Sequence, residues 1–123
     1  MILKEQVLTK TVAMPSDTNP NGDIFGGWLL SQMDVAGAIL ARSIAKGRVV
    51  TVAVESMKFF YPVKVGDTVT CFGKVKKIGT TSVSVELRVS SESWEQTEQK
   101  EVTRGKFVYV AIDENGNSKK LPR

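Results

Sequence analysis

One long apolar stretch dominates the sequence: Trp28-Leu29-Leu30-Ser31-Gln32-Met33-Asp34-Val35-Ala36-Gly37-Ala38-Ile39-Leu40-Ala41. On a helix, its apolar residues occupy nearly every angular position, which is typical of a helix enclosed by protein. Lys46 suits the negative end of the helix dipole, and Gly47 is expected to cap the helix in a left-handed conformation. The predicted helix therefore runs from near Gly27 or Trp28 to about Lys46, and it needs a sheet that curves around it.

A single carboxylate, Asp34, interrupts this stretch. Burying an unpaired carboxylate costs several kcal/mol or forces it to take up a proton, so the position of Asp34 requires a reason. One interpretation turns Asp34 to solvent or pairs it with Arg42 or a lysine, and the other makes it a catalytic group whose small neighbours at positions 36–38 leave room for substrate. The loop at residues 17–27, rich in Asn, Asp, Gly and Pro, favours catalysis, because long ordered loops usually carry function.

Composition excludes several classes of chemistry. The 123 residues are enough for a single domain, residues 1–123, and their 41% hydrophobic and 24% charged content is ordinary for a globular protein. The chain has no histidine and one cysteine, Cys71, so an internal disulfide, zinc-type ligand clusters and histidine-based triads cannot form. We therefore expect no metal, and acid–base chemistry falls to Asp, Glu, Lys, Tyr or Cys.

Localisation and partners follow from charge and hydropathy. The amino-terminal segment is charged from Lys4 onward, and no apolar run approaches the ~20 residues that span a bilayer, so we expect a cytoplasmic protein without a membrane partner. The net charge of +4 favours anionic partners only weakly, because the basic residues are spread along the chain. The predicted strands lack exposed aromatics interleaved with basic residues, so nucleic acid is not an expected partner.

The segments around the helix are typical of strands. An extended segment around residues 7–14 precedes the loop, and β-branched or alternating segments follow the helix at residues 49–54, 57–61, 69–76, 82–90 and 101–112. Turn residues separate them, and the end of the chain from Lys119 is expected to be frayed. The prediction is an α+β hot-dog fold, a curved antiparallel sheet of five or six strands wrapped around one long central helix.

Two segments closely resemble the YciA-type acyl-CoA thioesterases of the hot-dog superfamily: Met14-Pro15-Ser16-Asp17-Thr18-Asn19-Pro20-Asn21-Gly22-Asp23-Ile24-Phe25-Gly26-Gly27-Trp28-Leu29-Leu30-Ser31-Gln32-Met33-Asp34 and Gly47-Arg48-Val49-Val50-Thr51-Val52-Ala53-Val54-Glu55-Ser56-Met57. The likeness covers nearly the whole chain. It implies a hydrolase that converts acyl-CoA and water to a free carboxylic acid and CoA.

By this resemblance, the catalytic positions are Asp34, Asn19, Gly26 and Gly27. Asp34 is the helix-borne carboxylate, a general base or a nucleophile, and the sequence leaves both routes open. Asn19 faces it across a dimer interface and positions water or substrate. Backbone N–H groups at the two glycines form an oxyanion hole at the start of the helix, and a tight turn with a packing role only is the alternative for them. Phe25 stands where many hot-dog thioesterases carry histidine, so the chemistry is not expected to need imidazole.

The resemblance also implies a site for the CoA phosphates at Arg48, Val49, Lys77, Gly79, Thr80, Thr81 and Ser82, with Lys58 as a weaker candidate. Such a segment offers cations, and its turn can offer backbone N–H groups. For each lysine taken alone, a solvated strand face is the alternative. Coenzyme A enters as part of the substrate, and no separate cofactor is expected.

Assembly follows from the implied positions of Asn19 and Asp34. Because the resemblance places them in different chains, a homodimer is the minimal unit, and related proteins imply a hexamer built as a trimer of dimers. Two other functions fit the same fold: a non-catalytic domain that binds or senses acyl-CoA, and a thioesterase that acts on acyl-carrier protein.

Overall fold

The computed structural model describes residues 4–95 and 98–122. Its elements follow in the order β1 (Gln6–Val12), the 3-10 turn η1 (Pro15–Asp17), α1 (Gly26–Ala45), β2 (Val49–Phe59), β3 (Thr68–Ile78), β4 (Ser82–Glu92) and β5 (Lys100–Ala111). The described part therefore holds five strands, because the predicted segments 49–54 and 57–61 merge into the single strand β2, which ends at Phe59, two residues before the predicted end. β2 contains two bulges, between Thr51 and Ala53 and between Glu55 and Lys58, where its pairing with β5 shifts in register. The second bulge lies where the two predicted segments meet.

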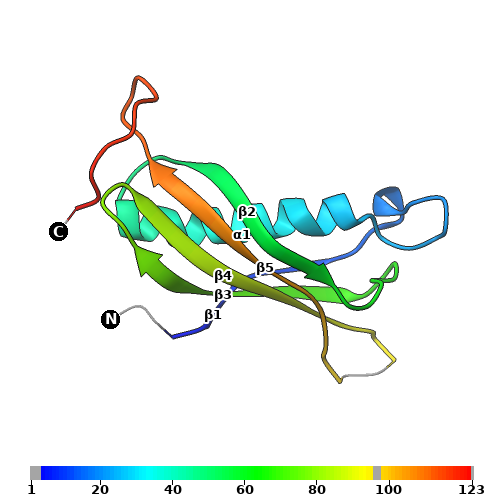
Figure 1. The fold of residues 1–123 in the computed structure, drawn as a ribbon. Coiled ribbons are helices and arrows are strands. Elements are labelled where there is room, and N and C mark those ends of the chain that lie inside the picture. The colour runs from blue at the N-terminus through cyan, green and yellow to red at the C-terminus, as the bar shows by residue number, and fades with distance from the viewer. Residues whose placement is uncertain (1–3, 96–97, 123) are drawn as a thin grey trace.

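The strands form one antiparallel sheet in the order β1-β3-β4-β5-β2. Figure 1 shows α1 lying lengthwise along one face of this twisted sheet, with the amino-terminal loop at one end of the helix and the chain's C-terminus at the other. Strands β1 and β2 are the two edges. The arrangement confirms the predicted α+β fold of one long helix on a curved antiparallel sheet.

The core lies between α1 and the central strands. The alternation predicted in β4 is confirmed, because its four apolar residues are fully buried: Val83, Val85, Leu87 and Val89. Leu29, Met33 and Leu40 of α1 belong to the same cluster. Cys71 of β3 is also buried in it, as predicted, and burial raises the pKa of its thiol, so it remains protonated and unreactive.

The ends of α1 differ slightly from the prediction. The helix begins at Gly26, directly after Phe25, and its last residue is Ala45. Lys46 rather than Gly47 takes the left-handed conformation, with φ of 54°, so the predicted glycine cap is wrong. The N–H group of Lys46 donates to the carbonyl of Arg42 and closes the helix, which places the reversal one residue earlier than expected.

The helix is not enclosed on all sides within one chain, contrary to the prediction. Val35 and Ile39 share one face of α1, one turn apart, and are 58% and 47% exposed. On the edge strand β2, Val52 and Val54 are 55% and 44% exposed. The sheet covers only one side of the helix, so the described part of the chain leaves these apolar side chains about half exposed.

The C-terminal segment is ordered as far as residue 122, so the predicted fraying is wrong there; Arg123 lies outside the described residues. The N–H group of Lys119 donates to Ala111, and that of Leu121 donates to Thr80. Leu121 is only 4% exposed, so burial of its side chain holds the segment down. Among the described residues, no helix is long and apolar enough to cross a membrane.

A pair of valines tests the assignment of the core. Val85→Ala is expected to lower the free energy of unfolding by about 2 kcal/mol, because it removes two buried methyl groups and leaves a cavity. Val7→Ala in β1, where the side chain is 58% exposed, is expected to change it by less than about 0.5 kcal/mol. Urea unfolding at one fixed protein concentration measures both, and equal losses would contradict the assigned core.

Candidate active site

Asp34 lies half-buried in the third turn of α1, and two hydroxyl groups contact its carboxylate. Thr51 Oγ1 of β2 donates to Oδ1 at 2.5 Å. Tyr109 Oη of β5 lies 3.1 Å from the same Oδ1 and 2.8 Å from the main-chain oxygen of Asp34. The alternative ion pair with Arg42 or a lysine does not occur among residues 4–95 and 98–122.

Tyr109 reaches Asp34 through space left by Gly37. A Cβ added at residue 37 would lie 2.3 Å from Tyr109 Oη, closer than atoms can approach. The expectation that the small residues beside Asp34 leave room for substrate is therefore wrong at Gly37, which is buried and whose space is filled by the tyrosine. A glycine inside a helix lowers the stability of the fold by about 1 kcal/mol relative to alanine. Here the glycine is needed because any larger residue would collide with the Tyr109 ring.

The phenol of Tyr109 is protonated at any ordinary pH. Burial raises its pKa well above the usual value, and the negative charge of Asp34 and the hydrogen bond to it raise it further. Tyr109 is therefore a permanent hydrogen-bond donor to Asp34.

Asn19 organises the loop that precedes α1. Its Oδ1 accepts hydrogen bonds from the N–H groups of Asn21 at 2.9 Å and Asp23 at 3.1 Å, and its own N–H donates to the Asp23 carbonyl at 2.7 Å. Asp23 is paired in turn with Lys64. The side-chain oxygen of Asn19 is thus used within the loop, and its amide NH₂ finds no acceptor in the described part of the chain.

The start of α1 carries free backbone donors. Phe25 makes no side-chain cap, and the N–H groups of Gly26 and Gly27 have no acceptor among the described residues. Neither glycine has a positive φ, and a Cβ at Gly27 would meet nothing within 4 Å. Turn geometry and packing within one chain therefore do not require glycine at position 27, which removes the packing alternative there.

An open cavity of about 360 Å³ borders this end of the helix. Its lining includes Asn19, Gly26, Leu29, Phe59, Phe60 and Val63. It combines the loop asparagine and the helix N-terminus with apolar side chains, which is the character of a small-molecule site.

One chain does not bring Asp34 to Asn19 and Gly26. Eight residues separate Gly26 from Asp34 on the helix, which is about 12 Å at 1.5 Å per residue. Asp34 contacts β2 and β5, whereas Asn19 contacts its own loop. The predicted catalytic residues therefore form two separate groups within a single chain.

Most of the predicted CoA-binding residues do lie together, around the end of β5. The carbonyls of Arg48, Thr81 and Thr80 accept hydrogen bonds from Ile112, Ala111 and Leu121 respectively. Val49 pairs with Ala111, and Ser82 pairs with Val110. Lys77 is exposed near the same turn, in the last residues of β3. The N–H group of Gly79 donates to the Ser82 carbonyl, so it is not a donor for a ligand.

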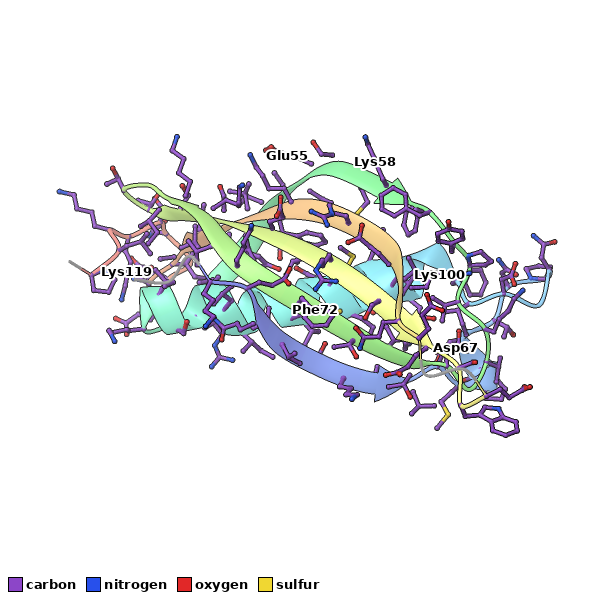
Figure 2. All side chains as sticks on the ribbon, turned by 90° about the horizontal axis from the view of Figure 1, so that it is seen from below. Glu55, Lys58, Asp67, Phe72, Lys100 and Lys119 are labelled. Carbon is purple, nitrogen blue, oxygen red and sulfur yellow. The ribbon has the colours of Figure 1, made fainter. Side chains whose placement is uncertain are left out.

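Lys58 lies apart from this group. It is near the far end of β2, opposite Arg104, about 30 Å along the strand from Val49 at 3.3 Å per residue. Figure 2 shows Lys58 on β2 near the middle of the molecule, well away from Lys119 at one end. Within one chain, Lys58 is not a neighbour of the other predicted CoA-binding residues.

The sequence did not single out Thr51 or Tyr109, although both hold Asp34. Thr51 is the one polar residue in the β-branched run at positions 49–54, and Tyr109 occupies an inward position of β5 beside Phe107. A buried tyrosine normally needs a hydrogen-bond partner, and that rule is the signal that could have pointed to a polar group near Tyr109.

The fold and these groups agree with the comparisons with known proteins. The chain belongs to the thioesterase superfamily, whose family model matches residues 21–97, more than half of its length. The acyl-CoA thioester hydrolase YciA of Salmonella typhimurium is 52% identical over 122 residues, which cover 95% of this chain and 90% of that protein.

Two solved structures share the whole fold. HI0827 is described as a hexameric broad specificity acyl-coenzyme A thioesterase, and its aspartate-to-alanine mutant superimposes with a TM-score of 0.94 at 52% identity, over 98% of this chain and 88% of that one. Cj0915 of Campylobacter jejuni, a hexameric hotdog fold thioesterase, has a TM-score of 0.89 at 42% identity, over 94% of this chain and 90% of that one. These similarities bear out the predicted family and fold.

Proposed function

We propose that this chain, as one domain, hydrolyses acyl-CoA thioesters to a carboxylic acid and CoA. The observation that carries the proposal is the half-buried carboxylate of Asp34, held by two hydroxyls and paired with no cation among the described residues. The similarity to YciA and to HI0827 supports the substrate class. The cytoplasm, expected from the sequence, remains our proposal for where it acts.

Asp34 supplies the proton chemistry. In one route it takes a proton from water as the water oxygen attacks the thioester carbonyl; the C–S bond then breaks, and the proton passes to the CoA thiolate. In the other route a carboxylate oxygen attacks the carbonyl, CoA leaves, and water opens the resulting mixed anhydride. Both routes use the same carboxylate and need only water besides the substrate, with coenzyme A as the leaving group.

Gly26 and Gly27 supply the oxyanion donors. Their N–H groups have no acceptor in the described part of the chain and lie at the positive end of the helix dipole, where they can stabilise negative charge on the carbonyl oxygen. Asn19 adds a donor rather than an acceptor, because its Oδ1 is engaged in the loop and only its NH₂ is available to substrate or water. The apolar residues of the adjoining cavity suit the acyl group.

The complete site needs two chains. The two groups of catalytic residues lie apart within one chain, while Val35, Ile39 and the edge strand β2 expose apolar surface beside Asp34. Pairing two copies along β2 would cover that surface and bring the loop of one chain to the helix of the other. We propose a homodimer as the minimal unit and, as in the hexameric relatives, a hexamer.

The same pairing gives Lys58 a role. Antiparallel pairing of two β2 strands places the Phe59 end of one beside the Val49 end of the other. Lys58 would then lie near the partner chain's segment around Arg48, and together with Lys77 these cations and the turn at residues 79–82 would hold the CoA phosphates.

A free-thiol assay over a panel of acyl-CoA chain lengths tests the proposal. We expect release of CoA at rates of at least about 1 s⁻¹ for some members of the panel. Saturable binding with no thiol release would instead indicate an acyl-CoA sensor. Acyl thioesters of acyl-carrier protein are assayed in parallel. Hydrolysis of these thioesters alone would indicate a thioesterase that acts on acyl-carrier protein.

Gly27→Ala tests the oxyanion hole. The new methyl group meets no atom within 4 Å in its own chain, so the melting temperature is expected to stay within a few degrees. The methyl group would instead obstruct the thioester, and kcat/KM is expected to fall about tenfold or more. A variant with normal stability, normal assembly and full activity would contradict close approach of substrate at Gly27.

A further inference from the structure

We propose that Tyr109 is a positioning residue that, together with Thr51, anchors Oδ1 of Asp34 and thereby leaves Oδ2 as the oxygen that reacts. The inference rests on the proposed catalytic role of Asp34. It adds to that role the choice between the two oxygens and the residues that make the choice.

Both hydroxyl donors converge on one oxygen. Thr51 Oγ1 lies 2.5 Å and Tyr109 Oη 3.1 Å from Oδ1. A carboxylate oxygen accepts about two hydrogen bonds through its lone pairs, so Oδ1 is occupied. Oδ2 accepts no hydrogen bond from the described residues, and its lone pairs remain available to a water molecule or a carbonyl carbon.

Tyr109 also fixes the orientation of the carboxylate. Its single O–H is shared between the main-chain oxygen of Asp34 at 2.8 Å and Oδ1 at 3.1 Å, so the phenol links the side chain of Asp34 to its own backbone. Thr51 approaches from a different strand, β2. Two donors from two strands restrict rotation about the side-chain bonds, which would otherwise exchange the two oxygens.

Gly37 gives independent support. Any side chain at this position would collide with Tyr109 Oη, with the first carbon only 2.3 Å away. Apart from proline, glycine has the lowest helix propensity of all residues. It occurs in this helix at the position where the Tyr109 hydroxyl packs against the backbone. The ring itself is otherwise buried with Phe107, so a phenylalanine at position 109 would keep the apolar packing and lose only the hydroxyl.

Tyr109→Phe is the direct test. We expect kcat to fall about tenfold or more with little change in KM, because the carboxylate loses its fixed geometry while the substrate contacts remain. Ser91→Ala is the matched control: it also removes a hydroxyl that donates to a buried carboxylate, that of Asp67 at 3.0 Å, but far from Asp34. We expect its kcat to stay within about twofold of wild type.

Variants of Thr51 provide a second test, which can be read even if Tyr109→Phe fails to fold. Thr51→Val removes the hydroxyl from an exposed position and is expected to lower kcat about tenfold, whereas Thr51→Ser keeps the hydroxyl and is expected to retain most of it. Equal activity of the valine and serine variants, or unchanged kcat in a folded Tyr109→Phe enzyme, would overturn the anchoring of Oδ1.

A crystal structure of the wild-type enzyme with a non-hydrolysable S-alkyl-CoA thioether tests the choice of oxygen. We expect Oδ2 to face the carbon that replaces the carbonyl, and Oδ1 in that place would overturn the inference. Asp34→Asn assayed in parallel separates the two proposals. An inactive Asp34→Asn beside a fully active Tyr109→Phe overturns only this inference, whereas an active Asp34→Asn overturns the catalytic role of Asp34 itself.

Discussion

Asp34→Asn is expected to reduce kcat/KM for acyl-CoA by about a hundredfold or more. The amide is nearly the same size as the carboxylate but can neither take up a proton nor attack a carbonyl. Thr51 and Tyr109 can both donate to the amide oxygen, so the side chain should keep its place. The loss should therefore appear in kcat, measured by release of free thiol, while the affinity for a thioether analogue of the substrate changes little.

Thermal unfolding of the same variant is the control. An unchanged melting temperature together with lost activity assigns Asp34 to chemistry, whereas loss of both assigns it to folding. Thiol release within a fewfold of wild type would remove Asp34 from the mechanism. Tight binding of acyl-CoA by a wild-type protein that never releases thiol would favour the sensor function instead.

Mixing two inactive variants is expected to restore activity, because each site combines Asp34 from one chain with Asn19 from another. Asp34→Ala and Asn19→Ala should each be nearly inactive alone. After the two are unfolded and refolded together, a mixed dimer has one site with both substitutions and one site with neither. Random pairing makes half of the dimers mixed, so recovery should approach about a quarter of the wild-type activity.

The control is the same mixture made by combining folded samples without exchange of chains, which should stay inactive. A site contained in one chain would give no recovery after refolding, because every chain would still carry a defect. That result would contradict the shared site, although it would leave the separate role of Asp34 intact.

Local patterns predicted most of the fold. The alternation of Val83, Val85, Leu87 and Val89 placed β4 correctly, because a period of two depends only on neighbouring residues. The helix was found within a residue or two at each end, and the carboxylate on it was recognised from its apolar neighbours. The left-handed position at Lys46 was missed, because glycine propensity favoured the next residue and the last helical hydrogen bond decided otherwise.

The surroundings of Asp34 were not predictable in the same way. Thr51 is 17 residues and Tyr109 75 residues from Asp34 in the chain, and nothing in the local sequence of either residue specifies the other. From the sequence, the missing side chain of Gly37 was expected to leave space for substrate beside the carboxylate. Only the packing of β5 against α1 shows that a phenol fills that space.

The sequence by itself determined the family, the order of the elements, the absence of histidine-based chemistry and the residue that carries the charge. These properties depend on composition, on short-range periodicity and on a resemblance that runs along the chain. The tertiary structure alone decided which oxygen of Asp34 is held, which groups hold it, and that one chain keeps Asn19 and Asp34 apart. Hydrogen bonds and distances between strands and helix arise only when residues far apart in the sequence are packed together.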